Sequence, residues 1–221
     1  LYLRIISDKK YYMAKNYTKI INSLPNSIPF VGPETQERLL DKQFDSRIGA
    51  NESGFGPSPK ALKVMKDEAS SLWMYGDPEN YDLKIEIAKK HNIKSQNIVV
   101  GEGIDGLLGY LVRMLVEPND NVVTTDGSYP TFNYHVNGYA GLLKKIPFKE
   151  DFEDLASLCS FSKKLRPKIV YVSNPNNPMG TFNNKTEIQA FINEVPDDTI
   201  ICLDEAYADF VPDNELIDIN V

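Results

Sequence analysis

The sequence predicts an α/β fold with a mostly parallel sheet that is flanked by helices. Short apolar runs, typical of buried strands, alternate along the chain with longer segments of helical pattern. Unusual polar residues follow directly after several of these runs, at the place where parallel sheets bind their ligands. The length of 221 residues, of which 42% are hydrophobic and 25% charged, suits one large domain or one domain with arms.

Residues 1–50 are predicted to form an N-terminal arm. The stretch is weakly patterned, and its prolines, Pro33 among them, interrupt any long element. The chain begins with leucine, and Met13 is the only methionine near its start, so residues 1–12 are candidates for a non-native extension. They lack the long apolar core and the small-residue cleavage site of a signal peptide.

Regular elements are predicted from Ser58 onward. Ser58 and Pro59 look like a helix N-cap and a proline at the first helical position, and a second helix is predicted over Glu79–His91. The alternating pattern then predicts strands at Ile98–Val100, Asn121–Thr125, Leu142–Pro147, Ile169–Ser173 and Thr199–Leu203, and helices at Asp105–Val116, Thr131–Asn137, Phe152–Lys163 and Lys185–Asn193.

Composition and charge argue against several classes of function. The formal net charge of -7 does not favour binding to nucleic acid or to an anionic membrane, and no apolar run approaches the length of a membrane span. Cys159 and Cys202 form no C-x-x-C pair, and His91 and His135 lack ligand spacing, so no metal site is predicted. Two isolated cysteines fit a reducing compartment, and we expect a cytoplasmic protein.

Two candidate binding motifs are weak when each is taken alone. Gly101-Glu102-Gly103-Ile104-Asp105 joins a predicted strand to a predicted helix, and free N–H groups at a helix start favour a phosphate. A glycine turn between strand and helix is nevertheless common, and a structural role is favoured for the motif by itself. Tyr129 follows the next strand and could stack on an aromatic ligand or simply pack in the core.

Two further motifs follow the apolar strands near the end of the chain. The run from Ser173 to Gly180 has two Asn-Pro steps and presents amide side chains, either as a plain turn or as hydrogen-bond donors to a ligand oxygen. Asp204 comes directly after an apolar strand. A carboxylate there is costly unless it is paired with a cation or a donor, and a protonated pyridine nitrogen would serve. The alternative is an ordinary helix N-cap.

Taken together and in order, these motifs resemble the fold-type I aminotransferases of the class I/II group, and are most similar to the histidinol-phosphate aminotransferase branch. The resemblance runs from about Arg47 to Phe210 and is specific because the motifs fall in sequence at successive strand ends. The residues that carry it are Asn51-Glu52, Gly56-Pro57-Ser58-Pro59, Tyr75-Gly76-Asp77-Pro78, Gly103-Ile104-Asp105, Tyr129, Asn176-Asn177-Pro178-Met179-Gly180 and Asp204-Glu205-Ala206-Tyr207.

The resemblance implies pyridoxal 5'-phosphate as the cofactor, with an amino acid and a 2-oxo acid as substrates. It also implies a homodimer, because one tyrosine of the motif set would reach the cofactor phosphate of the neighbouring subunit. By resemblance, Asp204 would pair with the ring nitrogen, Asn177 and Tyr207 would hydrogen-bond the ring oxygen, and Tyr129 would stack on the ring. Ile104 and Asp105 would hold the phosphate, and Tyr75 would reach the cofactor of the neighbouring subunit. Asn51 and Phe55 would line the substrate entrance.

Three departures from the family pattern matter. Phe55 replaces the family's usual tyrosine, which puts histidinol phosphate as the substrate in doubt, and Met179 replaces a usual threonine. The family's Schiff-base lysine is expected beyond Val221, since no lysine occurs after Lys185; the arginine that grips the substrate carboxylate is expected there too. We therefore expect residues 51–221 to form a partial PLP-transferase large domain, truncated before the catalytic-lysine strand and the small domain. A related amino-acid-phosphate decarboxylase and a non-catalytic remnant are the alternatives.

Overall fold

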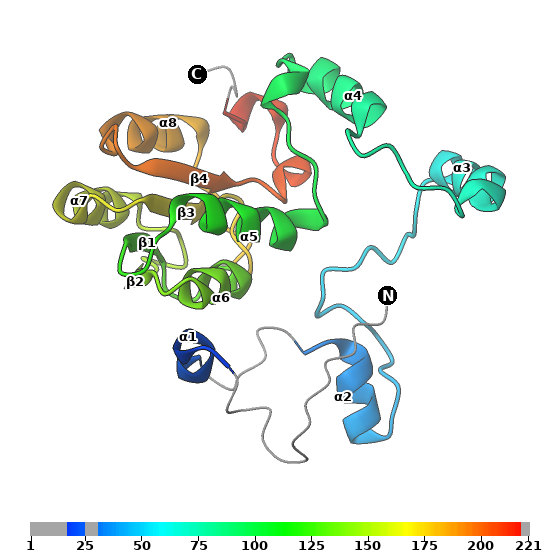
Figure 1. Ribbon diagram of the computed structural model, residues 1–221, viewed down its shortest axis with the longest axis horizontal. Helices are drawn as coiled ribbons and strands as arrows, with labels where there is room; N and C mark the ends of the chain where they lie inside the picture. Colours follow the sequence, from blue (N-terminus) through cyan, green and yellow to red (C-terminus); the bar gives the residue numbers. More distant parts are fainter. Residues whose placement is uncertain (1–16, 25–30, 218–221) are drawn as a thin grey trace. The chain divides into compact units, whose positions relative to one another are not determined.

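The computed structural model describes residues 17–24 and 31–217 (Figure 1). The chain divides into two compact units, one spanning Ile28–Val100 and the other Leu1–Ser27 with Gly101–Val221. We describe each unit by itself. In the described residues, no helix combines the length and the apolar composition needed to cross a bilayer.

The unit of Ile28–Val100 contains three α-helices and no buried residue among those described. Pro33 does not interrupt a helix there but begins one, because its missing N–H is not needed in the first helical turn. Asp77 accepts hydrogen bonds from the N–H groups of Glu79 and Tyr81, which explains why the second predicted helix begins at Tyr81 rather than Glu79. The helices are α2 (Pro33–Leu40), α3 (Pro59–Asp67) and α4 (Tyr81–His91), with 3-10 turns at Glu68–Ser71 and Ser95–Asn97.

The predicted start of α3 is confirmed. Ser58 lies at the N-cap, its side-chain oxygen accepts a hydrogen bond from the N–H of Ala61 at 3.1 Å, and Pro59 opens the helix. The capping serine satisfies one of the donors that every helix leaves free at its start.

The strand predicted at Ile98–Val100 is wrong. These residues have no strand assignment. A strand is held by hydrogen bonds to a neighbouring strand, and no described segment pairs with this one. Three apolar residues in a row are typical of a buried strand, but Val99 is 73% exposed here.

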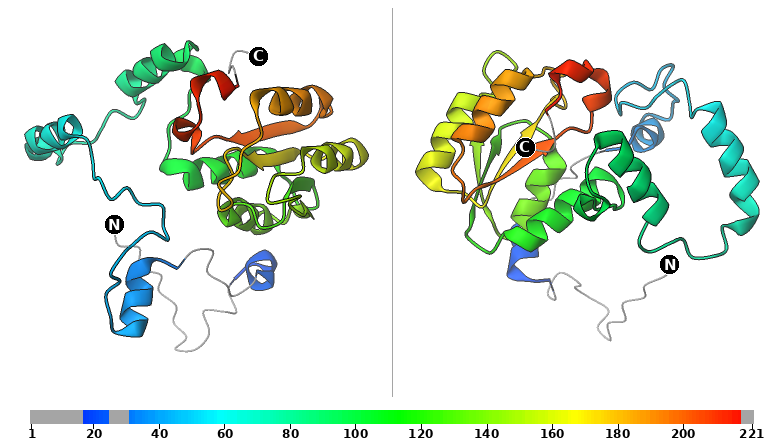
Figure 2. Two further views of the ribbon diagram at one scale, coloured as in Figure 1. Left: turned by 180° about the vertical axis from the view of Figure 1, so that it is seen from behind. Right: turned by 90° about the horizontal axis from the view of Figure 1, so that it is seen from above.

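The other unit is built on a parallel sheet of four strands in the order β2-β1-β3-β4, which confirms the predicted α/β class. One helix precedes the first strand, and three helices connect the successive strands (Figure 2). The strands are β1 (Asn121–Thr125), β2 (Leu142–Ile146), β3 (Ile169–Ser173) and β4 (Ile200–Asp204), and the helices are α5 (Gly103–Leu115), α6 (Pro130–Gly138), α7 (Leu155–Leu165) and α8 (Lys185–Glu194). A short helix α1 (Lys19–Ser23) and 3-10 turns at Ala208–Phe210 and Asp213–Glu215 complete the described elements.

Alternate residues of each strand enter two separate cores, one on each face of the sheet. Ile169 and Tyr171 of β3 pack with residues of α5 and α6. Val170 and Val172 of the same strand pack with residues of α7 and α8. All five residues of β3 are buried, as expected for a strand that is covered on both faces. The two helical layers therefore hold the strand ends rigidly in place.

The carboxyl ends of the strands lie at one edge of the sheet. Ser173 at the end of β3 pairs with Asp204 at the end of β4, and Val123 of β1 pairs with Val170 of β3. The loops that follow β1, β3 and β4 therefore begin side by side. This edge is where a parallel sheet offers a ligand site.

Candidate functional site

Asp204 ends β4 and is only 6% exposed. One carboxylate oxygen, Oδ2, accepts a hydrogen bond from the Tyr171 hydroxyl at 2.5 Å. The other, Oδ1, accepts one from the N–H of Ala206 at 3.0 Å. Within the part of the chain that the structure describes, no cation forms an ion pair with Asp204. A buried carboxylate held by neutral donors alone retains the capacity to accept a hydrogen bond from a cationic ligand group.

Tyr129 lies close to both Asp105 and Asp204. Its hydroxyl donates to Asp105 Oδ1 at 2.7 Å. Burial raises the pKa of Tyr129, and the hydrogen bond to Asp105 and the negative charges of Asp105 and Asp204 raise it further. The loop after β1 and the start of α5 therefore meet at the strand edge that carries Asp204. Tyr129 keeps its proton there and remains a neutral aromatic surface.

The start of α5 presents backbone N–H groups without intrahelical partners. Gly103 has a φ of +77°, which L-residues with side chains rarely adopt, so the turn into the helix requires glycine. Glu102 precedes it, and its carboxylate accepts a hydrogen bond from the Tyr110 hydroxyl at 3.2 Å. Asp105 is held as well, since its carbonyl oxygen lies 3.0 Å from Nε2 of His135. This helix start is suited to an anion.

The loop after β3 uses its asparagines in different ways. Asn174 exchanges two hydrogen bonds with the backbone of Asn183, and Asn176 accepts one from the N–H of Met179. These two side chains shape the loop. Asn177 instead donates from Nδ2 to the hydroxyl of Tyr207 at 3.3 Å, which joins the loop after β3 to the loop after β4.

A buried glutamate at the same edge was not predicted from the sequence. Glu153 is 3% exposed and accepts hydrogen bonds from Thr125, Ser128 and Asn176, and from the backbone N–H of Ser173. Burial raises the pKa of Glu153, while these hydrogen bonds act in the opposite direction. The side chain ties the loop after β1 to the loop after β3.

The position of Glu153 gives no sequence signal, because its partners lie 20 to 28 residues away along the chain. The segment was predicted to be helical from Phe152. The helix begins at Leu155 instead, because Asp154 caps it by accepting a hydrogen bond from the N–H of Ser157. Glu153 is thereby left outside the helix, where its side chain reaches the strand ends.

The carboxylate of Asp204 also influences its neighbours. Burial raises the pKa of Glu205, and the charge of Asp204 adds to the effect. Burial and the same charge raise the pKa of Cys202 to about 12. Cys202 is therefore a thiol at neutral pH and not a nucleophile.

This geometry can be compared with known proteins. The family model for aminotransferase class I and II matches residues 47–220. The chain belongs to the class I and II aminotransferase family.

Relatives in this family match most of the aminotransferase chain. Histidinol-phosphate aminotransferase 2 of Carboxydothermus hydrogenoformans is 32% identical over 192 residues, which cover 87% of this chain and 53% of that protein. The aromatic amino acid aminotransferase of Thermobifida fusca is 33% identical over 207 residues, or 93% of this chain and 57% of that protein. The chain spans about half the length of the curated relatives it matches.

A solved structure supports the same assignment. Histidinol-phosphate aminotransferase from Sinorhizobium meliloti, in complex with pyridoxal-5'-phosphate, superposes with a TM-score of 0.89 at 44% sequence identity. The match covers 96% of this chain and 56% of that one. The α/β sheet with its flanking helices is thus the PLP-transferase fold.

Three predicted site residues of the aminotransferase chain belong to the other unit. Tyr75 and Phe55 are fully exposed there, and Asn51 has a left-handed backbone with φ of +56°. Asp204, Asn177 and Tyr129 belong to the unit that contains the sheet. The roles of Tyr75, Phe55 and Asn51 stay predictions.

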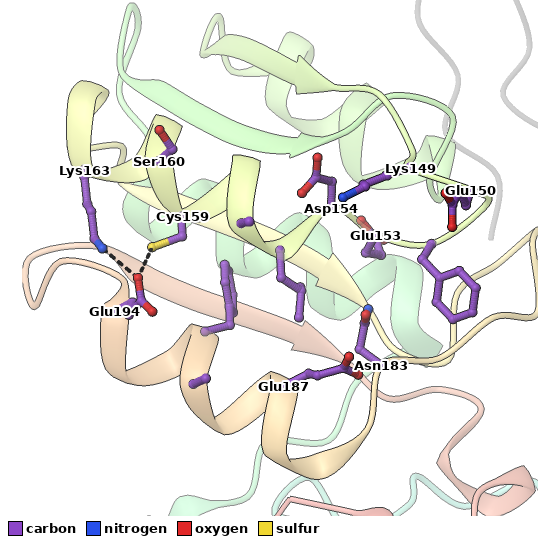
Figure 3. Close-up of a pocket in the computed structure, with 15 residues that line it drawn as sticks. Lys149, Glu150, Glu153, Asp154, Cys159, Ser160, Lys163, Asn183, Glu187 and Glu194 are labelled. Carbon is purple, nitrogen blue, oxygen red and sulfur yellow. Dashed lines mark hydrogen bonds and ion pairs between the residues drawn. The ribbon is translucent and has the colours of Figure 1, made fainter.

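A cavity of about 810 Å³ lies between α7 and α8 (Figure 3). None of the predicted site residues lines it. At one end Lys163 and the Cys159 thiol both contact Glu194 Oε2, at 2.8 and 3.7 Å. Burial raises the pKa of Cys159, so this thiol is not activated. Glu153 lines the other part of the cavity, and its side chain reaches the strand edge that carries Asp204.

Proposed function

We propose that the protein binds pyridoxal 5'-phosphate at the carboxyl edge of its sheet and transfers an amino group between an amino acid, or a similar amine, and a 2-oxo acid. The family membership and the relatives named aminotransferases support the reaction class. The relative from Sinorhizobium meliloti, whose structure contains the cofactor, supports the cofactor.

The observation that carries the proposal is the buried carboxylate of Asp204. It is oriented by two neutral donors and lacks a cationic partner among the described residues. A protonated pyridine nitrogen is a cationic donor that fits this acceptor. The cofactor, when bound, would supply an electron sink at its ring, and Asp204 would keep the ring nitrogen protonated.

Other side chains of the same edge match the remaining parts of the cofactor. Asn177 and Tyr207 already form a pair and would donate hydrogen bonds to the ring oxygen. Tyr129 would cover one ring face, and the N–H groups of Ile104 and Asp105 at the start of α5 would hold the phosphate. Tyr75 would serve the site of the neighbouring subunit in a homodimer.

Two substrate classes are in question. Several relatives are histidinol-phosphate aminotransferases, and we propose a substrate amine of that kind. Phe55 favours the second candidate, an aromatic amino acid, since an apolar ring at the substrate entrance offers no hydroxyl to a phosphate. The aromatic amino acid aminotransferase of Thermobifida fusca supports this second candidate. The decarboxylase and the non-catalytic remnant are not favoured, because these relatives are aminotransferases by name.

The isolated free cysteines Cys159 and Cys202 are compatible with a reducing compartment, and we propose that the protein acts in the cytoplasm.

The test is an amino-transfer assay with added pyridoxal 5'-phosphate and 2-oxoglutarate, on the full-length protein that includes the Schiff-base lysine expected beyond Val221. Histidinol phosphate and phenylalanine serve as alternative donors, and the formation of glutamate is measured. We expect transfer from at least one donor and a loss of roughly 10- to 100-fold in Asp204→Asn, since one hydrogen bond to a charged group contributes about 1.5–3 kcal/mol. No transfer from either donor, or full activity in Asp204→Asn, would contradict the proposal.

A further inference from the structure

Tyr171 lies in the middle of β3, where its side chain is completely buried. It belongs to the core that α5 and α6 form against the sheet. Its ring stacks on Phe132 of α6, with ring centroids 4.3 Å apart and an angle of 13° between the planes. The backbone of the strand and the stacked ring together fix the direction of the hydroxyl.

The Tyr171 hydroxyl points along the sheet toward Asp204. The strand register explains the contact: Tyr171 pairs with Cys202, and Asp204 lies two residues further on, on the same face. The hydroxyl donates to Asp204 Oδ2 at 2.5 Å, and no other hydrogen bond of this hydroxyl is found in the described residues. Burial raises the pKa of Tyr171, and the Asp204 charge raises it further, so the hydroxyl keeps its proton and always donates.

The two donors divide the carboxylate between them. Tyr171 donates to Oδ2, and the N–H of Ala206 donates to Oδ1. Rotation of the carboxyl group about the Cβ–Cγ bond would therefore break at least one of these hydrogen bonds. Phenylalanine would fill the core almost as well as tyrosine. A buried hydroxyl has a desolvation cost that only a partner offsets, and the partner here is the one carboxylate of the proposed ring-nitrogen site.

We propose that Tyr171 is a positioning residue, which orients the carboxylate of Asp204 toward the ring nitrogen of pyridoxal 5'-phosphate. The inference rests on the proposed function. Tyr171 is a core residue that would touch neither cofactor nor substrate. Through Asp204, it would determine how strongly the site prefers a ring with a nitrogen to a ring without one.

The test compares two ligands on the chain as it exists. One is pyridoxal 5'-phosphate, and the other is an analogue in which a C–H group replaces the ring nitrogen. Dissociation constants are measured by titration for the unsubstituted chain and for Tyr171→Phe. We expect Tyr171→Phe to bind pyridoxal 5'-phosphate roughly tenfold more weakly, the scale of one hydrogen bond to a charged group, and to bind the analogue unchanged.

The control is Tyr134→Phe, which removes a hydroxyl from the exposed side of α6 and should leave both constants unchanged. Rescue is tested by placing p-aminophenylalanine at position 171, because its amino group restores a donor. If Tyr171→Phe does not fold, 4-fluorophenylalanine at this position takes its place, since fluorine occupies the volume of the hydroxyl without donating.

The outcomes separate the two proposals. An unsubstituted chain that binds both ligands equally well would contradict the proposed function. If the unsubstituted chain prefers pyridoxal 5'-phosphate and the position 171 variants keep the full preference, only the role of Tyr171 is wrong. An equal loss of affinity for both ligands would show that Tyr171 acts through the fold alone, and would also overturn the inference.

Discussion

Two buried carboxylates at the strand edge differ in how far the sequence could predict them. Asp204 was predicted, because an acidic residue directly after an apolar strand is unusual enough to be noticed in the sequence alone. Glu153 was not, because its four partners come from the ends of two strands and from the loops that follow them. A side chain that is defined by long-range contacts has no local pattern. The same holds for Tyr171, whose sequence context indicates only a buried strand.

The pH dependence of stability should report on Glu153. Its pKa is raised in the folded chain by burial, so the folded state holds the proton more tightly than the unfolded state. Stability is then highest below the unfolded pKa of about 4.3 and falls as the pH rises toward the folded pKa. We expect Glu153→Gln, which stays neutral, to gain stability relative to the unsubstituted chain between pH 4.5 and 7.5, as measured by urea unfolding.

A second substitution separates the charge of Glu153 from its hydrogen bonds. Glu153→Leu leaves Asn176 and Thr125 without their buried partner, so we expect a loss of about 2–4 kcal/mol at both pH values. A relative stability of Glu153→Gln that does not change with pH, or that falls as the pH rises, would show that the pKa of Glu153 is not raised in the folded chain.

At the scale of elements, the sequence located most helices and strands but could not supply pairing partners. Asn121–Thr125 and Ile169–Ser173 were predicted with the bounds that the structure gives, because apolar runs between turn residues are a local signal. Ile98–Val100 has the same local signal and no strand, since pairing depends on distant segments. Some helices begin two or three residues later than predicted, because an aspartate side chain accepts hydrogen bonds from N–H groups near the observed start, as Asp154 does for α7.

The capping box of α8 gives a direct test at this scale. Asn184 accepts a hydrogen bond from the N–H of Glu187, and the Glu187 side chain accepts one from the N–H of Asn184. We expect Asn184→Ala to lower the free energy of unfolding by about 1 kcal/mol. The matched control is Asn193→Ala at the exposed end of the same helix, which should cost less than about 0.5 kcal/mol. Equal costs would argue against the capping role.

At the scale of the whole molecule, the two units differ in what stabilises them. The buried residues all belong to the unit that contains the sheet, and among the described residues of Ile28–Val100 none is buried. Apolar periodicity alone could not reveal this difference, because α3 has an apolar face as pronounced as that of α5 and yet has no buried residue. Burial depends on what packs against a helix, and that information is not local.

Hydrogen exchange should separate the units. We expect the amides of β1 and β3 to exchange slowest, because opening them requires loss of both cores, and the amides of α3 and α4 to exchange several orders of magnitude faster. Mass spectrometry of peptides from the exchanged chain measures both sets at once. Protection of α3 and α4 equal to that of the sheet would mean that their apolar residues are buried in solution.

The most direct test of the central claim is the protonation state of the bound cofactor. Pyridoxal 5'-phosphate labelled with nitrogen-15 in its ring would be added to the chain, and its nitrogen chemical shift recorded at a pH high enough to deprotonate the free cofactor. We predict the shift of a protonated ring in the unsubstituted chain and that of an unprotonated ring in Asp204→Asn. A bound ring that is unprotonated in both, or protonated equally in both, would contradict the role of Asp204 on which the proposed function depends.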